Sequence, residues 1–245
     1  RSLSILIGSL SSSTAIPATL PGELPSAAVS ESASVQPASV QHREFTSADG
    51  ARLVGDLALP ATPRMAAIIC HPHPQYGGDR FNNVVSALFA ALPAADIAAL
   101  RFDFRDQFSG GAGERLDALA AIADVAAAVP GVPIVALGYS FGAMIALGLD
   151  DERVTALGLV APPLAMAPDI AAPAVPTLVL VPAHDQFSPP SASAPIVDRW
   201  AASAAAPIEH RTIEMADHSL VGHTGAVADQ VTAWLSPRRR LPSPL

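Results

Sequence analysis

A serine flanked by two glycines is the residue of this sequence best placed for nucleophilic chemistry. The serine lies in the run Gly138, Tyr139, Ser140, Phe141, Gly142. A short apolar segment precedes this run, and a segment with helical spacing of apolar residues follows it. A G-x-S-x-G turn between a strand and a helix is so tight that close neighbours of the serine must lack side chains. Such a turn would expose the Ser140 hydroxyl, and the helix dipole and the Phe141 amide would favour a developing oxyanion beside it.

An acid and a base follow the serine at the ends of two later β-rich runs. A serine hydroxyl needs a general base to activate it, and the base needs a carboxylate to orient it. Asp185 comes soon after the run 177–181, and His218 follows the run 208–214. The carboxyl ends of parallel strands meet at one edge of a sheet. We therefore expect Ser140, Asp185 and His218 to converge there as a catalytic triad.

Two members of this predicted triad have alternatives. Asp185 could cap the helix that begins after Pro189, and His218 could be a surface loop residue. His184 and His223 are rival bases, although His184 directly precedes Asp185 and His223 opens the last helical segment. The position of His218 directly after the last β-rich run favours it as the base.

The sequence His71-Pro72-His73-Pro74, which follows another apolar run, contains a candidate second oxyanion donor. Neither proline has an N–H, so the backbone amide of His73 is the natural donor, and the flanking prolines would stiffen it. For His71 we expect a structural role, with its ring bonded to nearby backbone. The alternative is a metal site on the two histidines, but the further clustered ligands that zinc needs are not apparent nearby. The sequence thus predicts neither a metal site nor a cofactor.

The elements that must position these residues alternate between β-rich and helical runs. Continuous apolar runs typical of strands buried on both faces span 66–70, 97–104, 134–138, 154–160, 177–181 and 208–214. Segments with helical spacing lie at 82–92, 114–129, 141–149, 192–205 and 222–235. Alternating segments around an Asp49-Gly50 turn predict an antiparallel hairpin over 43–59. We expect an α/β fold with a mostly parallel, eight-stranded sheet and helices on both faces.

Composition divides the chain into three parts. Residues 1–41 are rich in Ser, Ala and Pro and lack periodicity, which is typical of a disordered leader or linker. One folded domain is expected over residues 42–236. Residues 237–245, which combine arginine with proline, are expected to be a flexible tail.

The bulk properties exclude several classes of function. The net charge is −8, and every basic residue is Arg. An acidic chain repels the phosphate backbone of nucleic acids, so no nucleic-acid partner is expected. A single cysteine, Cys70, excludes an internal disulfide, and we expect it to be a buried thiol. No apolar run approaches ~20 residues, so no membrane span is expected. Cytoplasmic localisation is the default, export through the apolar stretch 3–10 is the alternative, and the oligomeric state stays open.

Several of these motifs together resemble the dienelactone-hydrolase-like group of α/β hydrolases over residues 43–236. They are His71-Pro72-His73-Pro74, Gly77-Gly78, Asn82-Asn83, Arg101-Phe102-Asp103-Phe104-Arg105, Gly138-Tyr139-Ser140-Phe141-Gly142 and Ala216-Asp217-His218. The resemblance implies an α/β-hydrolase fold whose second strand is antiparallel, a Ser–Asp–His triad, and hydrolysis of carboxylic esters or related acyl bonds without a cofactor. Arg101, Asp103 and Arg105 are expected to form a structural ion-pair cluster below the site.

These observations predict a serine hydrolase that cleaves the carboxylic ester of a small-molecule acyl substrate through an acyl-enzyme. The amides of His73 and Phe141 would hold the oxyanion, and Tyr76 and Tyr139 are the candidate substrate-binding side chains. A thioesterase, a peptidase or a perhydrolase would use the same triad, and a catalytically silent binding or scaffold protein could keep the fold. The presence of all three triad members argues against the scaffold. The turn over residues 138–142 is the nucleophile elbow of this fold. Dehalogenases and epoxide hydrolases carry Asp at the position of Ser140 in the elbow, so Ser140 excludes those activities.

The predicted site is open and has no cap domain. The junction between the runs 154–160 and 177–181 is short and rich in proline, so it can hardly build a helical cap. Lid domains of this fold are commonly inserted at that junction. Without one, little apolar wall would be left to bury a long chain, and the sequence predicts a preference for short acyl groups.

Overall fold

The computed structural model describes residues 38–236, and most of the predicted leader and the whole predicted tail lie outside this range. The first strand, β1 (Ser39–Thr46), begins before the domain boundary expected at residue 42. Residues 39–41 pair with the end of strand β2 (Arg52–Leu59) in the predicted antiparallel hairpin. The sheet therefore includes these residues, because strand pairing orders them whatever their composition.

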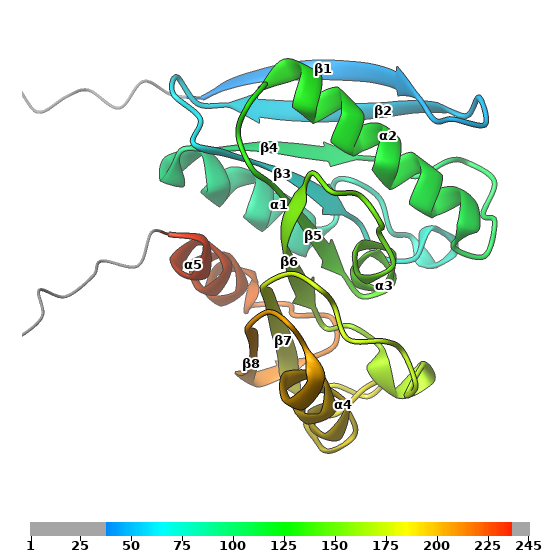
Figure 1. Cartoon of the computed structure of the whole chain (residues 1–245), viewed down its shortest axis with the longest axis vertical. Coiled ribbons are helices and arrows are strands. Elements are labelled where there is room, and N and C mark those ends of the chain that lie inside the picture. The colour runs from blue at the N-terminus through cyan, green and yellow to red at the C-terminus, as the bar shows by residue number, and fades with distance from the viewer. Residues whose placement is uncertain (1–37, 237–245) are drawn as a thin grey trace, which may run out of the picture. The chain divides into compact units, whose positions relative to one another are not determined.

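An eight-stranded sheet forms the centre of the described chain, in the order β1-β2-β4-β3-β5-β6-β7-β8 (Figure 1). The six strands after the hairpin are β3 (Met65–Cys70), β4 (Ile97–Phe102), β5 (Ile134–Tyr139), β6 (Val154–Val160), β7 (Thr177–His184) and β8 (Ile208–Asp217). Strand β2 is antiparallel to both of its neighbours, and all strands from β3 onward run parallel. The predicted fold class, a mostly parallel sheet of eight strands, is confirmed.

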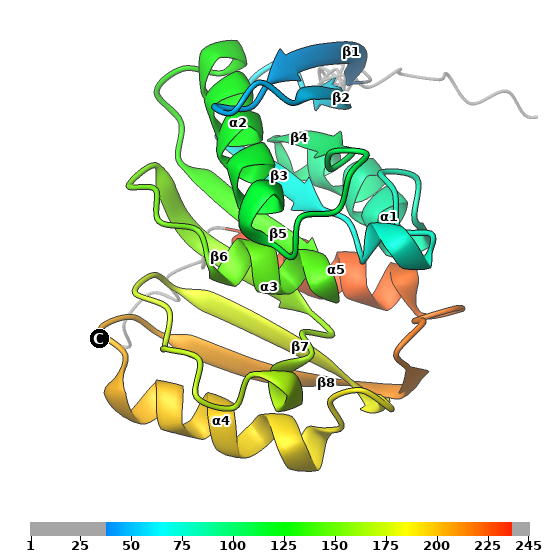
Figure 2. The ribbon, with the colours of Figure 1, turned by 90° about the vertical axis from the view of Figure 1, so that its right-hand side faces the viewer.

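Helices cover both faces of the sheet, as Figure 2 shows. They are α1 (Asn83–Ala91), α2 (Ala112–Ala128), α3 (Phe141–Leu147), α4 (Pro190–Ser203) and α5 (Thr224–Leu235). Helices α1 and α5 pack on one face, whereas α2, α3 and α4 pack on the other. Within β5, Ala136 faces the core under α2 and α3, and its neighbour Leu137 faces the core under α1 and α5. Burial on both faces explains why the strands appear as continuous apolar runs.

The two strands that lead to the base and the acid extend beyond their apolar runs. Strand β7 continues to His184 and β8 to Asp217, and these two residues pair after a register shift. Hydropathy does not report these ends, because both side chains are polar and exposed. The pairing places the next residue of each strand, Asp185 and His218, at the same edge of the sheet.

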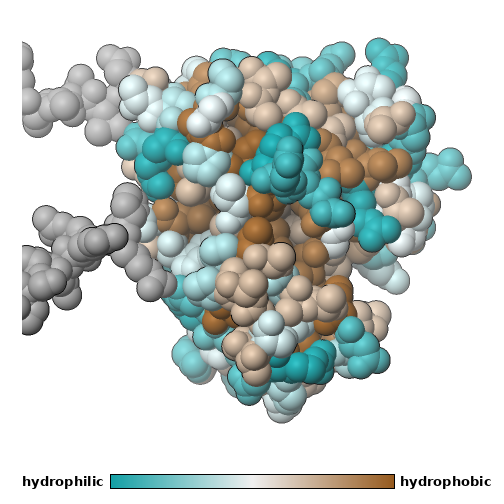
Figure 3. Space-filling model, viewed as in Figure 1, coloured by the Kyte–Doolittle hydropathy of each residue, from teal (hydrophilic) through white to brown (hydrophobic). Residues whose placement is uncertain are grey.

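The connection between β6 and β7 builds no cap. Its regular structure is one turn of 3-10 helix, Leu164–Met166, which confirms the prediction that the cap domain is missing. Figure 3 shows hydrophobic residues gathered over the middle of one face, with strongly hydrophilic residues above and below them. Among the helices described, none is long and apolar enough to cross a membrane.

Candidate active site

Ser140 lies on a tight turn between β5 and α3. Its backbone has φ 55° and ψ −118°, which is an uncommon conformation for a residue with a side chain. A side chain at Gly138 would overlap the carbonyl of Gly142, and a side chain at Gly142 would overlap the carbonyl of Cys70. The motif therefore needs both glycines, because backbone segments approach each other where a Cβ would lie.

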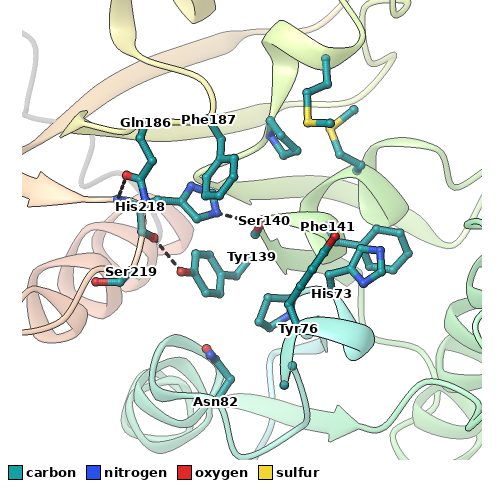
Figure 4. A pocket seen from close by; sticks show the side chains of 16 residues that line it. His73, Tyr76, Asn82, Tyr139, Ser140, Phe141, Gln186, Phe187, His218 and Ser219 are labelled. Carbon is teal, nitrogen blue, oxygen red and sulfur yellow. Dashed lines mark hydrogen bonds between the residues drawn. The ribbon is translucent and has the colours of Figure 1, made fainter.

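The three residues predicted as a triad meet beside this turn. Figure 4 shows two of them, Ser140 and His218, with the hydrogen bond between their side chains. The Ser140 Oγ lies 2.8 Å from the His218 Nε2, and the His218 Nδ1 lies 2.8 Å from the Asp185 Oδ2. Because an ionised carboxylate only accepts hydrogen bonds, His218 donates its Nδ1–H to Asp185, which leaves Nε2 to accept the serine proton. The other carboxylate oxygen of Asp185 accepts hydrogen bonds from the backbone amides of Phe187 and Ser188.

Asp185 is buried, yet its surroundings keep it ionised. Burial acts to raise the pKa of this carboxyl, but hydrogen bonds from His218 and from two backbone amides outweigh burial and lower the pKa below its usual value. The bonds to the amides, which lie ahead of α4, do not compete with the bond to His218, because they use the other oxygen. An ionised Asp185 can fix the tautomer of the His218 ring and stabilise a cation on it.

The backbone of His218 is also held by side chains. Tyr139 donates its hydroxyl to the His218 carbonyl at 2.6 Å, and the Gln186 Oε1 accepts from the His218 amide at 3.3 Å. The Phe187 ring packs edge-on against the imidazole, with ring centroids 4.6 Å apart. Burial and two nearby carboxylates raise the pKa of Tyr139 to about 12, so its phenol remains a donor at neutral pH. These contacts, which motif spacing does not report, fix the position of the imidazole.

The turn that contains the two histidines and two prolines packs against the elbow, because Gly142 approaches the carbonyl of His71. His71 is buried and uses both ring nitrogens. Its Nδ1 donates to the Pro72 carbonyl at 2.6 Å, and its Nε2 accepts from the Phe104 amide at 3.0 Å. Burial lowers the pKa of His71, which keeps the ring neutral as this pair of bonds requires. His71 thus has the structural role expected from the sequence, and its bonded nitrogens oppose the alternative of a metal site.

His73 and Phe141, the predicted oxyanion donors, both line the pocket that contains Ser140. The Phe141 amide opens helix α3, where a backbone N–H has no partner within the helix. Within residues 38–236, neither this amide nor the His73 amide donates to a protein acceptor. The two side-chain rings pack with centroids 4.9 Å apart, which brings the two backbone segments together. Two residues that line the pocket therefore have backbone N–H groups without a protein acceptor in the described chain.

The two rival histidines lie elsewhere. His184 is exposed at the end of β7, and His223 precedes α5 at its N-cap position. In the part of the chain that the structure describes, the ring that bonds to both Ser140 and Asp185 is that of His218. The position directly after the last strand therefore identifies the histidine that lies beside the serine.

The pocket around Ser140 has a volume of about 800 Å³ and an apolar wall. Met144 of α3, Pro163 and Met166 of the connection after β6, and Phe187 after β7 form this wall. The expectation of a site with little apolar wall is wrong, because the short connection carries side chains that reach the pocket although it builds no cap. The reason for expecting a preference for short acyl groups is thereby removed.

The two candidate substrate-binding tyrosines differ in exposure. Tyr76 lies at the pocket mouth and is 88% exposed, whereas Tyr139 is buried and its hydroxyl bonds to the backbone of the histidine. Sequence reasoning missed Gln186 and Phe187, although their position next to the aspartate was a usable signal. The methionines of the apolar wall carry no such signal, because their contact with the pocket depends on the path of a loop.

The charged residues expected to cluster below the site all form ion pairs, but in two separate groups. Each expected member pairs with an opposite charge: Arg101 with Asp56, Asp103 with Arg80, and Arg105 with Asp117 and Asp49. These pairs connect β2 and β4 to the loop before α1 and to α2. Arg101 and Asp103 are linked through Asp56 and Arg80, whereas Arg105 pairs apart from them, so the expected ion pairs form but not as one cluster.

Solved structures similar to this chain are α/β hydrolases. A protein of unknown function from Agrobacterium tumefaciens, described as an α/β hydrolase, is 28% identical with a TM-score of 0.73, and the match covers 80% of this chain and 94% of that one. XC6422 from Xanthomonas campestris, described as an α/β serine hydrolase without a lid, is 26% identical with a TM-score of 0.67. That match covers 86% of this chain and 99% of XC6422. The fold is therefore that of the α/β hydrolases, and the similarity supports a hydrolase.

Comparisons of sequence alone reach less of the chain. No family model matches it. The uncharacterized protein RP471 of Rickettsia prowazekii is 34% identical over 110 residues, which are 42% of this chain. The match covers 46% of RP471, so the chain spans about half the length of this curated relative.

Proposed function

We propose that this chain, a member of the α/β hydrolases, is a serine hydrolase that cleaves carboxylic esters through an acyl-enzyme. The observation that carries the proposal is the hydrogen-bonded series Ser140, His218, Asp185, in which both heavy-atom distances are 2.8 Å. A nucleophile bonded to a base, and a base bonded to an orienting carboxylate, is the geometry that acyl transfer requires. A scaffold protein that had lost catalysis would have no need for this alignment.

In the first half-reaction, the Ser140 Oγ attacks the carbonyl carbon of the ester while its proton moves to the Nε2 of His218. The carbonyl oxygen becomes an oxyanion, for which the amides of His73 and Phe141 are the proposed donors. When this intermediate collapses, the bond to the alcohol oxygen breaks, and His218 gives its proton to that oxygen. The alcohol leaves, and the acyl group stays on Ser140.

In the second half-reaction, water replaces the alcohol. His218 takes a proton from the water as its oxygen attacks the acyl carbonyl, and the same two amides receive the oxyanion. The bond to Ser140 then breaks, the serine oxygen regains the proton from His218, and the carboxylic acid leaves. Asp185 stays ionised through both halves, which its lowered pKa supports.

Labelling with an uncharged fluorophosphonate tests this proposal, because the probe reacts with an activated serine. The wild-type protein should be labelled at Ser140 and should hydrolyse p-nitrophenyl butyrate. Ser140→Ala should abolish labelling and lower kcat by at least ~10³-fold, with an unchanged circular dichroism spectrum and melting temperature. Ser203→Ala, at an exposed serine of α4 outside the pocket, is the matched control and should change neither result. A folded Ser140→Ala variant that kept most of the activity would refute the assignment.

Related acyl bonds can be ranked in the same assay. Thioesters and amides would react through the same steps, so the ester is distinguished by rate rather than by mechanism. A butyrate ester, a butyryl thioester and a butyranilide share one acyl group and differ only in the leaving atom. We expect the highest kcat/KM for the ester, and a higher value for the thioester or the anilide would reassign the bond that is cleaved.

A further inference from the structure

We propose that this site takes uncharged esters and rejects acyl groups that end in a carboxylate. The inference rests on the proposed function, because it names the substrate class of the same site. Two features of the pocket carry it: the exposed apolar wall, and the lack of an arginine among the described residues that line the pocket. The pocket is large enough for a substrate of this kind, at about 800 Å³.

The apolar wall is exposed although its side chains are large. Met166 has 76% of its surface exposed and Phe187 has 54%. Large apolar side chains that gather at a pocket mouth, rather than scatter over the surface, indicate a binding surface for an apolar group. Phe187 lies on one side of Ser140, across the pocket from Asn82, as Figure 4 shows. A methionine side chain is flexible and polarisable, so this wall can adapt to acyl groups of different shape.

The polar groups of the pocket carry no fixed charge. Among the described residues that line it, none is an arginine, an aspartate or a glutamate. Two of the neutral polar side chains are already used, because the Asn82 Oδ1 accepts from the Val84 amide and the Gln186 Oε1 accepts from the His218 amide. Neutral groups of this kind can bind an ester oxygen, but they cannot compensate the formal charge of a carboxylate.

The arginines close to the pocket are neutralised by other residues. Arg80 lies two positions before the pocket residue Asn82, and its guanidinium pairs with Asp103 and Asp56. Arg101 pairs with the same Asp56. All these side chains are partly buried, so turning Arg80 toward a substrate would break its ion pair with Asp56 and leave Asp103 without the cation that it pairs with. The cluster therefore holds the loop and supplies no cation to the pocket.

The fixed charges next to the histidine are negative. Asp185 is bonded to His218 from one side, and Asp217 directly precedes His218 and is exposed. A hydrogen bond from the Ser219 hydroxyl lowers the pKa of Asp217, which is therefore ionised at neutral pH. A substrate carboxylate in this pocket would lose its hydration and would meet repulsion instead of a counter-ion. An uncharged acyl chain loses nothing of this kind and gains contact with the methionines.

The test compares two p-nitrophenyl esters that differ at the end of a six-carbon acyl chain. The hexanoate ends in a methyl group, and the monoadipate ends in a carboxylate. For the wild-type protein we expect a kcat/KM at least ~10-fold higher on the hexanoate, because the carboxylate would be desolvated without a partner. The ratio should persist in about 0.5 M NaCl, since salt screens long-range repulsion but does not remove a desolvation cost.

A charge introduced into the wall should change this ratio. Met166→Arg places a cation at the pocket, and we expect it to raise kcat/KM for the monoadipate and to lower it for the hexanoate. Met215→Arg is the matched control, because Met215 is 77% exposed, close to the 76% of Met166, but is not among the residues that line the pocket. The same charge at Met215 should leave the ratio as it is in the wild-type protein.

Each outcome separates the inference from the proposed function. Equal rates on the two esters, or faster hydrolysis of the monoadipate, would overturn the inference and leave the proposed function intact. A change in ratio as large in Met215→Arg as in Met166→Arg would also overturn it, because net charge and not the pocket would then select the substrate. If neither ester is hydrolysed and Ser140 resists the fluorophosphonate, the proposed function fails and the inference fails with it.

Discussion

The two halves of the candidate site are held in place by different means. On the nucleophile side the backbone fixes Ser140, because Gly138 and Gly142 permit close approaches that a side chain would prevent. This turn follows β5, whose residues are all buried. On the base side, Asp185 and His218 follow the ends of two strands, and side-chain hydrogen bonds fix them. Steric exclusion positions the first half, and a few polar contacts position the second.

This difference predicts different responses to substitution. A substitution that adds a side chain on the nucleophile side should reduce stability and activity together, since the elbow joins β5 to α3 and packs against the end of β3. Loss of a single positioning contact on the base side should raise the activation free energy by about the net contribution of one hydrogen bond. It should leave the fold intact. Loss of the base itself is the exception, because the chemistry is removed with it.

The largest effect is expected for the base. His218→Ala should lower kcat/KM for p-nitrophenyl butyrate by at least ~10³-fold, because His218 is the group among residues 38–236 that bonds to the Ser140 hydroxyl and can take its proton. His223→Ala removes the rival histidine at the start of α5 and should leave kcat/KM nearly unchanged. An active His218→Ala variant together with an inactive His223→Ala variant would show that the base side has been assigned to the wrong loop.

Substitution at the elbow is expected to lower activity less than loss of the base, but to lower stability as well. Gly142→Ala should destabilise the fold by about 1–3 kcal/mol, because the added methyl group would overlap the carbonyls of Cys70 and His71. It should also lower kcat by about 10²-fold through displacement of the serine. Urea unfolding and steady-state kinetics measure the two effects. Gly225→Ala is the matched control, since nothing lies near its Cβ position in α5 and alanine favours a helix by ~0.5–1 kcal/mol.

The same difference decides what the sequence alone could predict. The elbow was predictable because its steric conditions fall on particular residue types, two glycines around Ser140. The order of the runs was sufficient to predict that Asp185 and His218 follow strands at the same sheet edge. The bond between Tyr139 and His218 was not predictable, because it joins the end of β5 to the end of β8 across strands that are not neighbours in the sheet.

The ends of elements and the pocket wall show the same limit. Strand β7 continues to His184 through backbone pairing with β8, whereas its apolar run ends earlier. Met166 reaches the pocket through the path of a loop, and a loop path depends on packing that hydropathy does not record. Hydrophobic periodicity therefore predicts which segments form the sheet, and tertiary contacts decide how the last residues of each segment are used.

A moderate effect of pH on stability is expected on the nucleophile side. The folded protein holds His71 neutral with a lowered pKa, whereas the unfolded chain protonates this residue below its ordinary pKa of ~6.5. The unfolded state then binds more protons, so stability should fall as the pH drops below ~6.5, by at most ~1.4 kcal/mol per pH unit for one group. His71→Gln, which cannot be protonated, should show a shallower fall in the free energy of unfolding.

A second histidine serves as the control for this pH effect. His210 is half-buried, and burial lowers its pKa as well, so His210→Gln should also flatten the curve to some extent. The two histidines differ in their partners, because His71 bonds to the backbone through both ring nitrogens and the His210 Nε2 is buried without a partner in the described chain. His71→Gln should therefore cost stability at pH 8, whereas His210→Gln should not. Parallel curves for wild type and His71→Gln would contradict the neutral state of His71.

Tyr139→Phe is expected to reduce activity by about the contribution of one hydrogen bond. The substitution keeps the ring and removes the hydroxyl that bonds to the His218 carbonyl, so kcat should fall by about 3–10-fold with little change in KM. If Tyr139 acts through the position of the imidazole, its effect should shrink in a variant whose imidazole is already misoriented. Asp185→Asn provides that background in a double-mutant cycle. Additive effects of the two substitutions would show that Tyr139 does not act through His218.

The smallest effect is expected for Gln186→Ala on the same side of the site. Its contact with the His218 amide is longer, at 3.3 Å against 2.6 Å for Tyr139, and Gln186 is exposed, so water can replace the lost acceptor. Tyr139 is buried, so water replaces its lost hydroxyl less readily as a donor to the His218 carbonyl. We therefore expect kcat to fall by less than about twofold in Gln186→Ala and by more in Tyr139→Phe. The opposite ranking in parallel assays would mean that the exposed loop after β7, and not the tyrosine of the elbow, positions the histidine. In the described structure, by contrast, Tyr139 belongs to the nucleophile turn and also holds the backbone of the base.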